Sequence, residues 1–586
     1  MPRHRDKKYH KKHDIRIDIL MAVVFLITDL IIFRLFVVQV VNHTFYTALA
    51  QDQHQIVADL LPERGQIFVQ DKYSDTLYPL ASNQKLTLVY AIPKQVKDRD
   101  DFAARLAPLL EMDEKNILER ISKEDDLYEP LKNKVTDERV EEIKKLNLNG
   151  IGFTKESWRI YPEGGLAAHI LGFVGYDGDQ RKGRYGIEGY YEDKLAGKMG
   201  HLEAEKDVGG RWISIGKKEI QPAVDGDDLV LTIDRAIQYK AEAELKSGVE
   251  KWGADSASII VMNPQNGEIL AMANYPTYDN NKYAEVKDIN VFNNAAIFEH
   301  YEPGSAFKPV CMAIALDEGV VSPDTTYTDT GAANVGGYTI HNYDNKSYGV
   351  QTMTNVLEKS INTGMVFVNE HLGAEKLYNG FLKLGLNELS GIDLDSEAAT
   401  ELKPPKTWRQ SNLATMGYGQ GIAITPIKLV VATAAMAEGG NLVTPYIVKE
   451  IIHHKADGTE TREEIPTKII RQALKPESAA TISAMLVSSM DNGYAKTGRI
   501  PGYHLAGKTG TAQVPLQGEK GYDPEKVITS FIGYGPIEDP RFLILVKFNN
   551  PKSTSSFRAD GVNTAAPVFK ELAQFLVNYY QIPPSE

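Results

Sequence analysis

Apolar and polar positions divide the chain into three parts. Residues 19–41 are almost all apolar and follow a basic start, and a run of about 20 residues is enough to cross a bilayer. Residues 95–148 are charged, with apolar residues at helical spacing, which predicts a few amphipathic helices. After residue 225, short apolar runs bounded by glycine and proline alternate with helical patterns.

The third part predicts a sheet with helices around it. Residues 256–263 and 268–273 are apolar runs on either side of a Pro-Gln-Asn-Gly turn, which predicts a hairpin. Three more strands are expected at residues 503–511, 528–535 and 542–548. Helices are expected at residues 236–251, 310–319, 425–440 and 565–580. Strands at both ends with helices between them favour the α+β class, with an antiparallel sheet flanked by helices.

The chain is expected to comprise four segments. They are a basic tail, a transmembrane anchor, a non-catalytic domain and a domain that carries the chemistry, at residues 1–18, 19–41, 42–225 and 226–586. Lysine and arginine precede the span and few follow it, so we expect a cytoplasmic amino end and everything after the span outside the plasma membrane.

Two features near the span leave alternatives open. Ala48-Leu49-Ala50 resembles a signal-peptidase site, so cleavage competes with a retained single-pass anchor, which the long apolar run favours. Asp29 lies near the middle of the span, where a charge is costly. It is either a tolerated, protonated residue or the contact point of a partner in the membrane.

Charge and cysteine content exclude several classes of function. The formal net charge of −13 argues against nucleic-acid binding. Cys311 is the single cysteine, which excludes an internal disulfide and a multi-cysteine metal site, and its apolar surroundings indicate packing. His169 also lies among apolar residues and is interpreted as structural. We expect neither a metal nor a cofactor.

Ser305 and Lys308 form the first candidate for chemistry. They lie three positions apart after a Pro-Gly turn, at the start of a predicted helix, so the amine can reach the hydroxyl. A serine is a weak nucleophile until a base removes its proton, and a lysine is such a base only when its charged form is destabilised. Taken alone, this pair is better explained as a capped helix with a surface lysine.

Two further motifs follow in the same domain. Ser360 and Asn362 flank Ile361 beside a predicted helix, and residues 508–511, Lys-Thr-Gly-Thr, lie on a predicted strand. Each motif alone is weak, and Lys-Thr-Gly could be a strand end with a turn glycine. The three motifs in this order within one domain are specific, because they supply a nucleophile, its base and a second cation.

With these motifs the chain resembles the penicillin-binding proteins, and among them the membrane-anchored, monofunctional class B transpeptidases. In the catalytic part the resemblance rests on residues 302–309, 360–362, 417–421 and 507–513. In the preceding part it rests on residues 64–67, 159–162 and 168–172. Ile361 departs from the aspartate common in the middle motif. The resemblance implies a transpeptidase domain on an elongated pedestal of the dimerisation type, and the division type more than the elongation type.

The resemblance also implies roles. Ser305 would attack the penultimate D-Ala carbonyl of a peptidoglycan stem peptide, Lys308 would take its proton, and Lys508 would be the second cation. Ser360 would relay a proton to the leaving amine, and Asn362 would hold Lys308 and the substrate amide.

Substrate binding is implied for the third motif. The hydroxyls of Thr509 and Thr511, with Gly510 between them, would receive the terminal carboxylate, and the backbone N–H groups of Ser305 and Thr511 would form an oxyanion hole.

The expected partners follow from this family. They are peptidoglycan stem peptides and β-lactam antibiotics, and a polytopic membrane glycosyltransferase is a candidate. Two enzyme alternatives share the motifs, a β-lactamase, against which the length and the pedestal argue, and a D,D-carboxypeptidase. A non-catalytic penicillin-binding scaffold or sensor is the alternative from another class.

Overall fold

The computed structural model separates the chain into two units. One comprises residues 1–62 and 198–224, and the other comprises residues 63–197 and 225–586. Every candidate site residue belongs to the second unit. The described residues are 15–37, 55–123, 126–178, 180–205, 218–455, 457–516, 518 and 521–585.

The first unit begins with an apolar helix, α1 (Ile15–Phe36). Its segment Ile19–Phe36 has a mean hydropathy of 2.5 and no buried share, and is long and apolar enough to cross a membrane. The span was expected to run to residue 41, and its residues 38–41 lie outside the described residues. Residues 1–14 of the basic tail and the cleavage-site candidate Ala48-Leu49-Ala50 lie outside them as well. A three-stranded sheet completes the unit, in the order β1 (Gln55–Leu60), β8 (Gly200–Glu205), β9 (Lys218–Gln221).

A seven-stranded sheet contains strands from both halves of the second unit. The first half is residues 63–197, and the catalytic half is residues 225–586. The order of the sheet is β19-β18-β10-β2-β3-β4, and β5 also pairs with β3. Strand β10 lies parallel to β2, with Leu229 opposite Ile67. The expected boundary after residue 225 stays a prediction, and three strands that follow it are part of this sheet. The strands are β2 (Ile67–Gln70), β3 (Leu77–Ala91), β4 (Glu129–Val135), β5 (Ile151–Ile160), β10 (Asp228–Leu231), β18 (Val448–His454) and β19 (Glu460–Glu464).

Residues 95–148 fold as a small helical lobe beside this sheet. Helices α3 (Arg99–Leu110), α4 (Glu114–Arg120) and α5 (Asp137–Lys145) bury their apolar faces in one cluster. The Asp98 carboxylate caps α3 by accepting a hydrogen bond from Asp101 N. Strand β4 interrupts the amphipathic helices that the pattern predicted.

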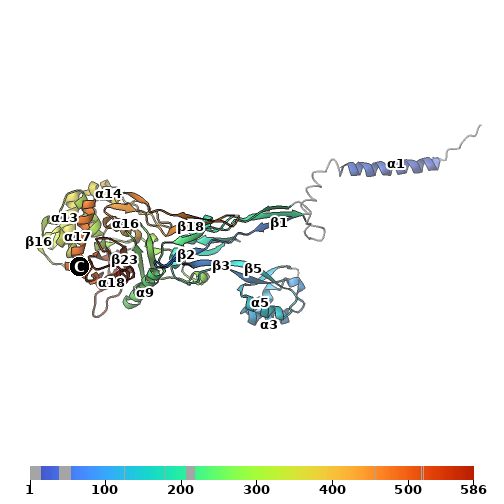
Figure 1. The fold of residues 1–586 in the computed structure, drawn as a ribbon, viewed down its shortest axis with the longest axis horizontal. Coiled ribbons are helices and arrows are strands. Elements are labelled where there is room, and N and C mark those ends of the chain that lie inside the picture. The colour runs from blue at the N-terminus through green and yellow to red at the C-terminus, as the bar shows by residue number, and fades with distance from the viewer. Residues whose placement is uncertain are drawn as a thin grey trace, which may run out of the picture. The chain divides into compact units, whose positions relative to one another are not determined.

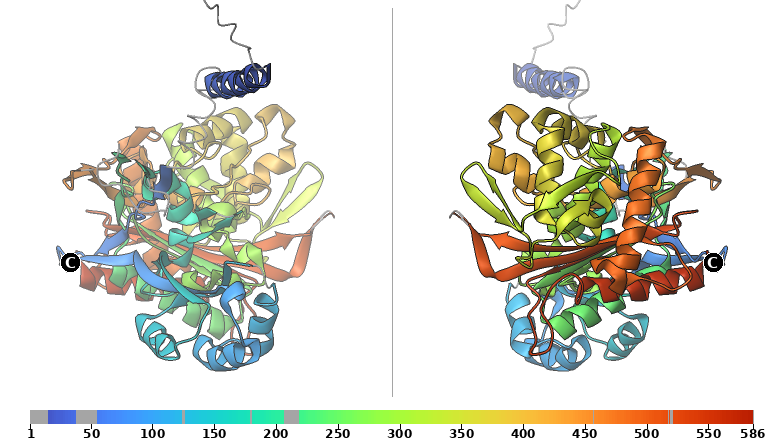
Figure 2. Two further views of the ribbon diagram at one scale, coloured as in Figure 1. Left: turned by 90° about the vertical axis from the view of Figure 1, so that its right-hand side faces the viewer. Right: turned by 90° about the vertical axis from the view of Figure 1, so that its left-hand side faces the viewer.

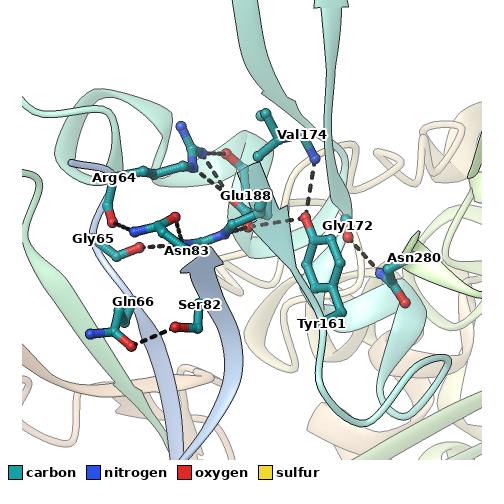
Figure 3. Close-up of polar contacts among 12 residues, drawn as sticks. Arg64, Gly65, Gln66, Ser82, Asn83, Tyr161, Gly172, Val174, Glu188 and Asn280 are labelled. Carbon is teal, nitrogen blue, oxygen red and sulfur yellow. Dashed lines mark hydrogen bonds and ion pairs between the residues drawn. The ribbon is translucent and has the colours of Figure 1, made fainter. Parts of the chain in front are cut away.

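The buried carboxylate of Glu188 connects residues 64–67 with residues 159–162, two of the segments on which the resemblance rests (Figure 3). The side chain of Glu188 has no exposed surface, and its oxygens lie 2.6 Å from Arg64 Nη2 and 2.6 Å from Arg159 Nε. The Tyr161 hydroxyl donates to the same carboxylate at 3.1 Å and accepts from Val174 N. Burial alone would raise the pKa of Glu188, but the two guanidinium groups outweigh it and lower the pKa.

The catalytic half contains a five-stranded antiparallel sheet, in the order β12-β11-β23-β22-β21. Helices α9 and α18 cover one face, α16 and α17 pack on the other, and α11 contacts both α16 and α17 (Figures 1 and 2). This arrangement confirms the expected α+β class. The strands are β11 (Ser256–Met262), β12 (Ile269–Tyr275), β21 (Ala506–Pro515), β22 (Tyr522–Gly535) and β23 (Phe542–Asn549). The five helices are α9 (Arg235–Trp252), α11 (Lys308–Asp317), α16 (Pro426–Ala437), α17 (Pro476–Asn492) and α18 (Ala565–Tyr579).

Strand β23 shows why its sequence is apolar without alternation. Phe542, Ile544 and Val546 belong to the core under α9 and α18, whereas Leu543 and Leu545 belong to the core on the opposite face. A strand with both faces buried needs apolar residues at every position.

Shorter elements surround this sheet. The remaining helices are α6 (Ala168–Leu171), α7 (Gly186–Tyr190), α8 (Glu192–Leu195), α10 (Ala295–Phe298), α12 (Met353–Glu358), α13 (Asn362–Leu372), α14 (Ala374–Lys383) and α15 (Gln410–Met416). Four two-stranded sheets in the described chain pair β6 (Phe173–Asp177) with β7 (Gln180–Arg184), β13 (Thr326–Asp329) with β16 (Gly349–Thr352), β14 (Ala332–Val335) with β15 (Tyr338–His341), and β17 (Asn441–Val443) with β20 (Ile469–Gln472).

Candidate active site

The Ser305 turn leads directly into a buried helix. Residues Gly304–Phe307 form a 3₁₀ turn, and α11 begins at Lys308 with Pro309 in its first turn. A proline is tolerated there because its missing N–H would have no helical partner. Ser305 is half-buried, whereas the Lys308 side chain is fully buried. The expected position of both residues at a helix start is confirmed.

The Lys308 ammonium is held by the second motif. Its Nζ donates to the Ser360 carbonyl oxygen at 2.5 Å, to Ser360 Oγ at 3.2 Å and to Asn362 Oδ1 at 2.8 Å. The Asn362 amide is itself oriented, since its Nδ2 donates to the carbonyl oxygen of His341 at 3.0 Å. The three hydrogens of the ammonium therefore all have acceptors.

Lys508 reaches the same hydroxyl from the sheet. Its Nζ lies 2.9 Å from Ser360 Oγ and 3.2 Å from the Thr509 carbonyl oxygen. Ser360 has a left-handed backbone with a φ of 51°, between α12 and α13. Such a conformation is costly for a residue other than glycine and is typical of functional sites. It leaves one hydroxyl within hydrogen-bond reach of two lysines.

Burial disfavours the protonated form of both lysines and so lowers their pKa values. Burial, followed by the nearby charge of Lys508, lowers the pKa of Lys308 well below its usual range. Burial alone lowers the pKa of Lys508 to about 7. Near neutral pH a neutral amine is therefore accessible beside Ser360, which is what a base requires.

Two glycines allow strand β21 to approach the Ser305 turn. A Cβ on Gly510 would lie 2.3 Å from Ser530 Oγ and 3.0 Å from the Ala306 Cβ. A Cβ on Gly304, whose φ is 55°, would lie 2.9 Å from the Ala512 Cβ. Neither position has room for a side chain, so the Lys-Thr-Gly glycine has a packing role against the nucleophile turn.

The Gly-rich segment 417–421 supports this turn from behind. Gly304 N donates to the Gly419 carbonyl oxygen at 3.0 Å, and a Cβ on Gly419 would lie 2.1 Å from the Gly304 carbonyl oxygen. The Glu302 carboxylate accepts a hydrogen bond from Gly421 N at 3.0 Å. The sequence resemblance had indicated this segment, and the structure supplies its physical reason.

Ser305 lies between two cavities. One, of about 190 Å³, is lined by Ser305 together with Ser360, Thr509 and Thr511. The other, of about 790 Å³, is lined by Ser305 together with Asn362 and Thr511. Lys308 and Lys508 bind Asn362 and Ser360 of this lining, and Gly510 packs against the Ser305 turn, so the structure brings all eight residues expected from the sequence into one place.

One detail differs from the sequence-based expectation. Within the described chain, Lys308 Nζ forms no hydrogen bond to Ser305 Oγ, because Ser360 and Asn362 accept its hydrogens. The Thr511 hydroxyl accepts a hydrogen bond from Gly561 N at 3.1 Å, which leaves its O–H able to donate to a carboxylate.

Sequence reasoning missed other residues that line the cavities. Tyr343 lines both, and Tyr494 and Asp560 line the smaller one. Arg409 and Arg558 line the larger one. These residues come from several distant segments of the chain, and no local pattern indicates them.

Two family models match the chain. The penicillin binding protein transpeptidase domain matches residues 257–574, and the penicillin-binding protein dimerisation domain matches residues 59–231. The first match covers more than half of the chain and contains Ser305, Ser360 and Lys508.

Similar whole chains carry related names. The stage V sporulation protein D of Bacillus subtilis is 34% identical over 93% of this chain and 82% of its own length. The peptidoglycan D,D-transpeptidase FtsI homolog of Mesostigma viride is 28% identical over 95% of this chain and 94% of its own. The crystal structure of penicillin binding protein 3 from Mycobacterium tuberculosis, complexed with aztreonam, has a TM-score of 0.68 and 26% identity, and covers 90% of this chain and 98% of that one.

Proposed function

The chain belongs to the penicillin-binding proteins that carry a transpeptidase domain and a dimerisation domain, and from this membership we propose a role for each residue around Ser305. The protein is a serine-type peptidoglycan D,D-transpeptidase of cell-wall synthesis and a target of β-lactams. The family, fold class and enzyme class expected from the sequence are confirmed. Within class B, the division type is proposed over the elongation type.

Acylation begins at Ser305. Its Oγ attacks the carbonyl carbon of the penultimate D-Ala while its proton passes to the neutral Lys308 amine. The C–N bond then breaks, the leaving D-Ala nitrogen takes a proton through Ser360, and an ester to Ser305 remains. In the second half, an amine of a neighbouring stem attacks this ester, and Ser305 regains a proton as the new amide forms.

The position of the Ser360 hydroxyl is the observation that carries this proposal. Ser360 Oγ lies 3.2 Å from Lys308 Nζ and 2.9 Å from Lys508 Nζ, in a cavity that Ser305 also lines. A hydroxyl both donates and accepts, so it can pass a proton between an amine and a leaving nitrogen. The surface-lysine explanation of the first motif fails, because Lys308 is fully buried.

Strand β21 is suited to bind the donor peptide. It is an edge strand of its sheet, and an edge strand offers unpaired backbone groups to an extended peptide. Lys508 and Thr509 at one end would bind the terminal carboxylate. The N–H groups of Ser305 and Thr511 would stabilise the oxyanion, at about 3 kcal/mol per donor in related chemistry.

Labelling with a fluorescent penicillin tests the nucleophile. The native chain should form a long-lived covalent adduct that Ser305→Ala abolishes. Release of D-Ala with or without transfer to an added amine acceptor then separates a transpeptidase from the D,D-carboxypeptidase alternative. Absence of any adduct would support the non-catalytic scaffold.

Helix α1 supports a location at the membrane. One apolar helix near the amino end fits a single-pass anchor. The amino end is proposed to be cytoplasmic and the catalytic half extracytoplasmic, since lysine and arginine gather before the span. Asp29 is proposed to contact a polytopic membrane glycosyltransferase. Loss of co-purification of such a protein in Asp29→Leu would support that contact, and unchanged co-purification would contradict it.

A further inference from the structure

The larger cavity beside Ser305 differs in charge from the rest of the chain. The chain has a formal net charge of −13. The described residues that line this cavity of about 790 Å³ nevertheless include Arg409 and Arg558, and none of them is an aspartate or a glutamate. A cleft lined by one sign of charge concentrates ligands of the opposite sign. The lining therefore favours a ligand that carries a negative group near Arg409 and Arg558.

Both guanidinium groups are available to a ligand. Arg409 and Arg558 are exposed, and neither forms an ion pair with a carboxylate anywhere in the described ranges. The Arg558 guanidinium lies over the Tyr343 ring, 4.6 Å from its centroid. A cation–π contact of this kind leaves the guanidinium N–H donors that point away from the ring for a carboxylate.

Glu302, one acidic residue next to this cavity, already has hydrogen-bond partners. The Glu302 carboxylate accepts hydrogen bonds from Gly421 N at 3.0 Å and from the Tyr522 hydroxyl at 3.1 Å. Both partners line the cavity, so Glu302 orients its wall. Among the described residues neither arginine forms an ion pair with this carboxylate, so Glu302 does not neutralise either of them.

The register of strand β21 indicates which part of a donor peptide reaches this end. With the terminal carboxylate at Lys508, a peptide pairing with β21 runs toward Gln513, which lines the larger cavity. The proposed function places the penultimate carbonyl at Ser305 and Thr511, which both line the larger cavity, so the residue before it lies about 3.3 Å further along the strand. That residue is the third of a pentapeptide stem.

We infer that Arg409 and Arg558 select donor stems whose third residue carries a free side-chain carboxylate over stems in which that group is an amide. The inference rests on the proposed function of Ser305 and names the specificity of the same site. The two arginines are specificity residues and take no part in bond making.

Competition against fluorescent-penicillin labelling tests this selection on the full chain in detergent. The competitors are two pentapeptide stems ending in D-Ala-D-Ala, identical except that the third side chain ends in a carboxylate or in its amide. The carboxyl of the second residue is amidated in both. The acid stem should halve the labelling rate at a concentration about three- to tenfold lower than the amide stem needs. This factor is what two exposed charge pairs are expected to contribute.

Variants connect the preference to the arginines. In Arg409→Gln/Arg558→Gln the ratio of the two half-effective concentrations should fall toward one, and Arg558→Glu should favour the amide stem. Arg558→Lys keeps the charge and should retain a preference for the acid. Arg462→Gln, which removes an exposed arginine paired with Glu450, is the matched control and should keep the native ratio.

The outcomes separate the inference from the proposed function. If Ser305 is not labelled at all, the proposed function fails. If labelling is normal but both stems compete equally in the native chain, or neither competes at millimolar concentration, the inference is overturned. A preference for the acid that persists in the double variant would overturn it as well. Higher salt should reduce a genuine preference, because the two arginines are exposed.

Discussion

The Lys508 ammonium lies 2.9 Å from the hydroxyl oxygen of Ser360, which connects the third sequence motif to the second. The same oxygen lies 3.2 Å from Lys308 Nζ, so one hydroxyl serves two buried amines. This contact spans 148 positions of the chain and depends on a sheet strand meeting the junction of two helices.

Removing the Ser360 hydroxyl should slow acylation without unfolding the protein. Both Ser360→Ala and Ser360→Gly should lower the rate of penicillin acylation by about 10²-fold or more, as for other lost proton-transfer groups. Their stabilities should differ, because the φ of 51° costs alanine about 1 kcal/mol and glycine almost nothing. Stopped-flow acylation and chemical denaturation would measure the two effects. Equal acylation in the native chain and in Ser360→Gly would refute the relay.

Folding stability should depend on Lys508 at alkaline pH. Its folded pKa is about 7, whereas an unfolded lysine keeps its proton to about pH 10. Between these values the unfolded state binds more protons, so stability should rise with pH, by up to about 1.4 kcal/mol per pH unit from this residue. Lys508→Met should lose this slope, whereas Lys526→Met, at an exposed lysine, should keep it. Denaturation at several pH values from 7 to about 9.5 would test it, and identical slopes in all three proteins would contradict it.

A side chain at Gly510 should push β21 away from the Ser305 turn. In Gly510→Ala the new Cβ would lie 2.3 Å from Ser530 Oγ, so we expect a loss of about 1–3 kcal/mol of stability and slower acylation. Ser530→Ala removes the closest contact and should restore part of the stability in the double variant. Thermal unfolding and acylation rates would be compared for the two single variants and the double one. No loss in Gly510→Ala would show that the strand has room to move.

The buried ion network of the first half should be important for stability and not for chemistry. Glu188→Gln leaves Arg159 without its carboxylate and Arg64 with Glu192 alone, and should cost about 3–5 kcal/mol. Glu142→Gln, which breaks an exposed pair with Arg139, should cost less than about 1 kcal/mol. Denaturation of the three proteins would measure this, and the folded fraction of Glu188→Gln should still be acylated. A cost as small as that of Glu142→Gln would mean that the network is dispensable.

Much of the catalytic half could be predicted from local patterns. The hairpin of β11 and β12, the three late strands and the closing helix α18 appear where apolar runs and turn residues indicated them. Strand pairing across long stretches was not predictable: β10 and β18 join a sheet with β2 and β3, because pairing depends on which edges meet in space. Strand β4 was missed among helical patterns, since its charged sequence has no alternation.

The sequence by itself determined the chemistry at hand: a serine with a lysine one turn away, a second serine with an asparagine, and a third motif with a second cation, in an order that indicates an acyl-serine enzyme. Only the tertiary structure decided which groups touch. It directs the Lys308 hydrogens to Ser360 and Asn362. It also brings Gly561 N to the Thr511 hydroxyl, and Arg409 and Arg558 to one cavity. The physical reason is that residue types and short spacings are local, whereas burial, hydrogen-bond partners and the charge of a cleft arise from segments brought together by folding.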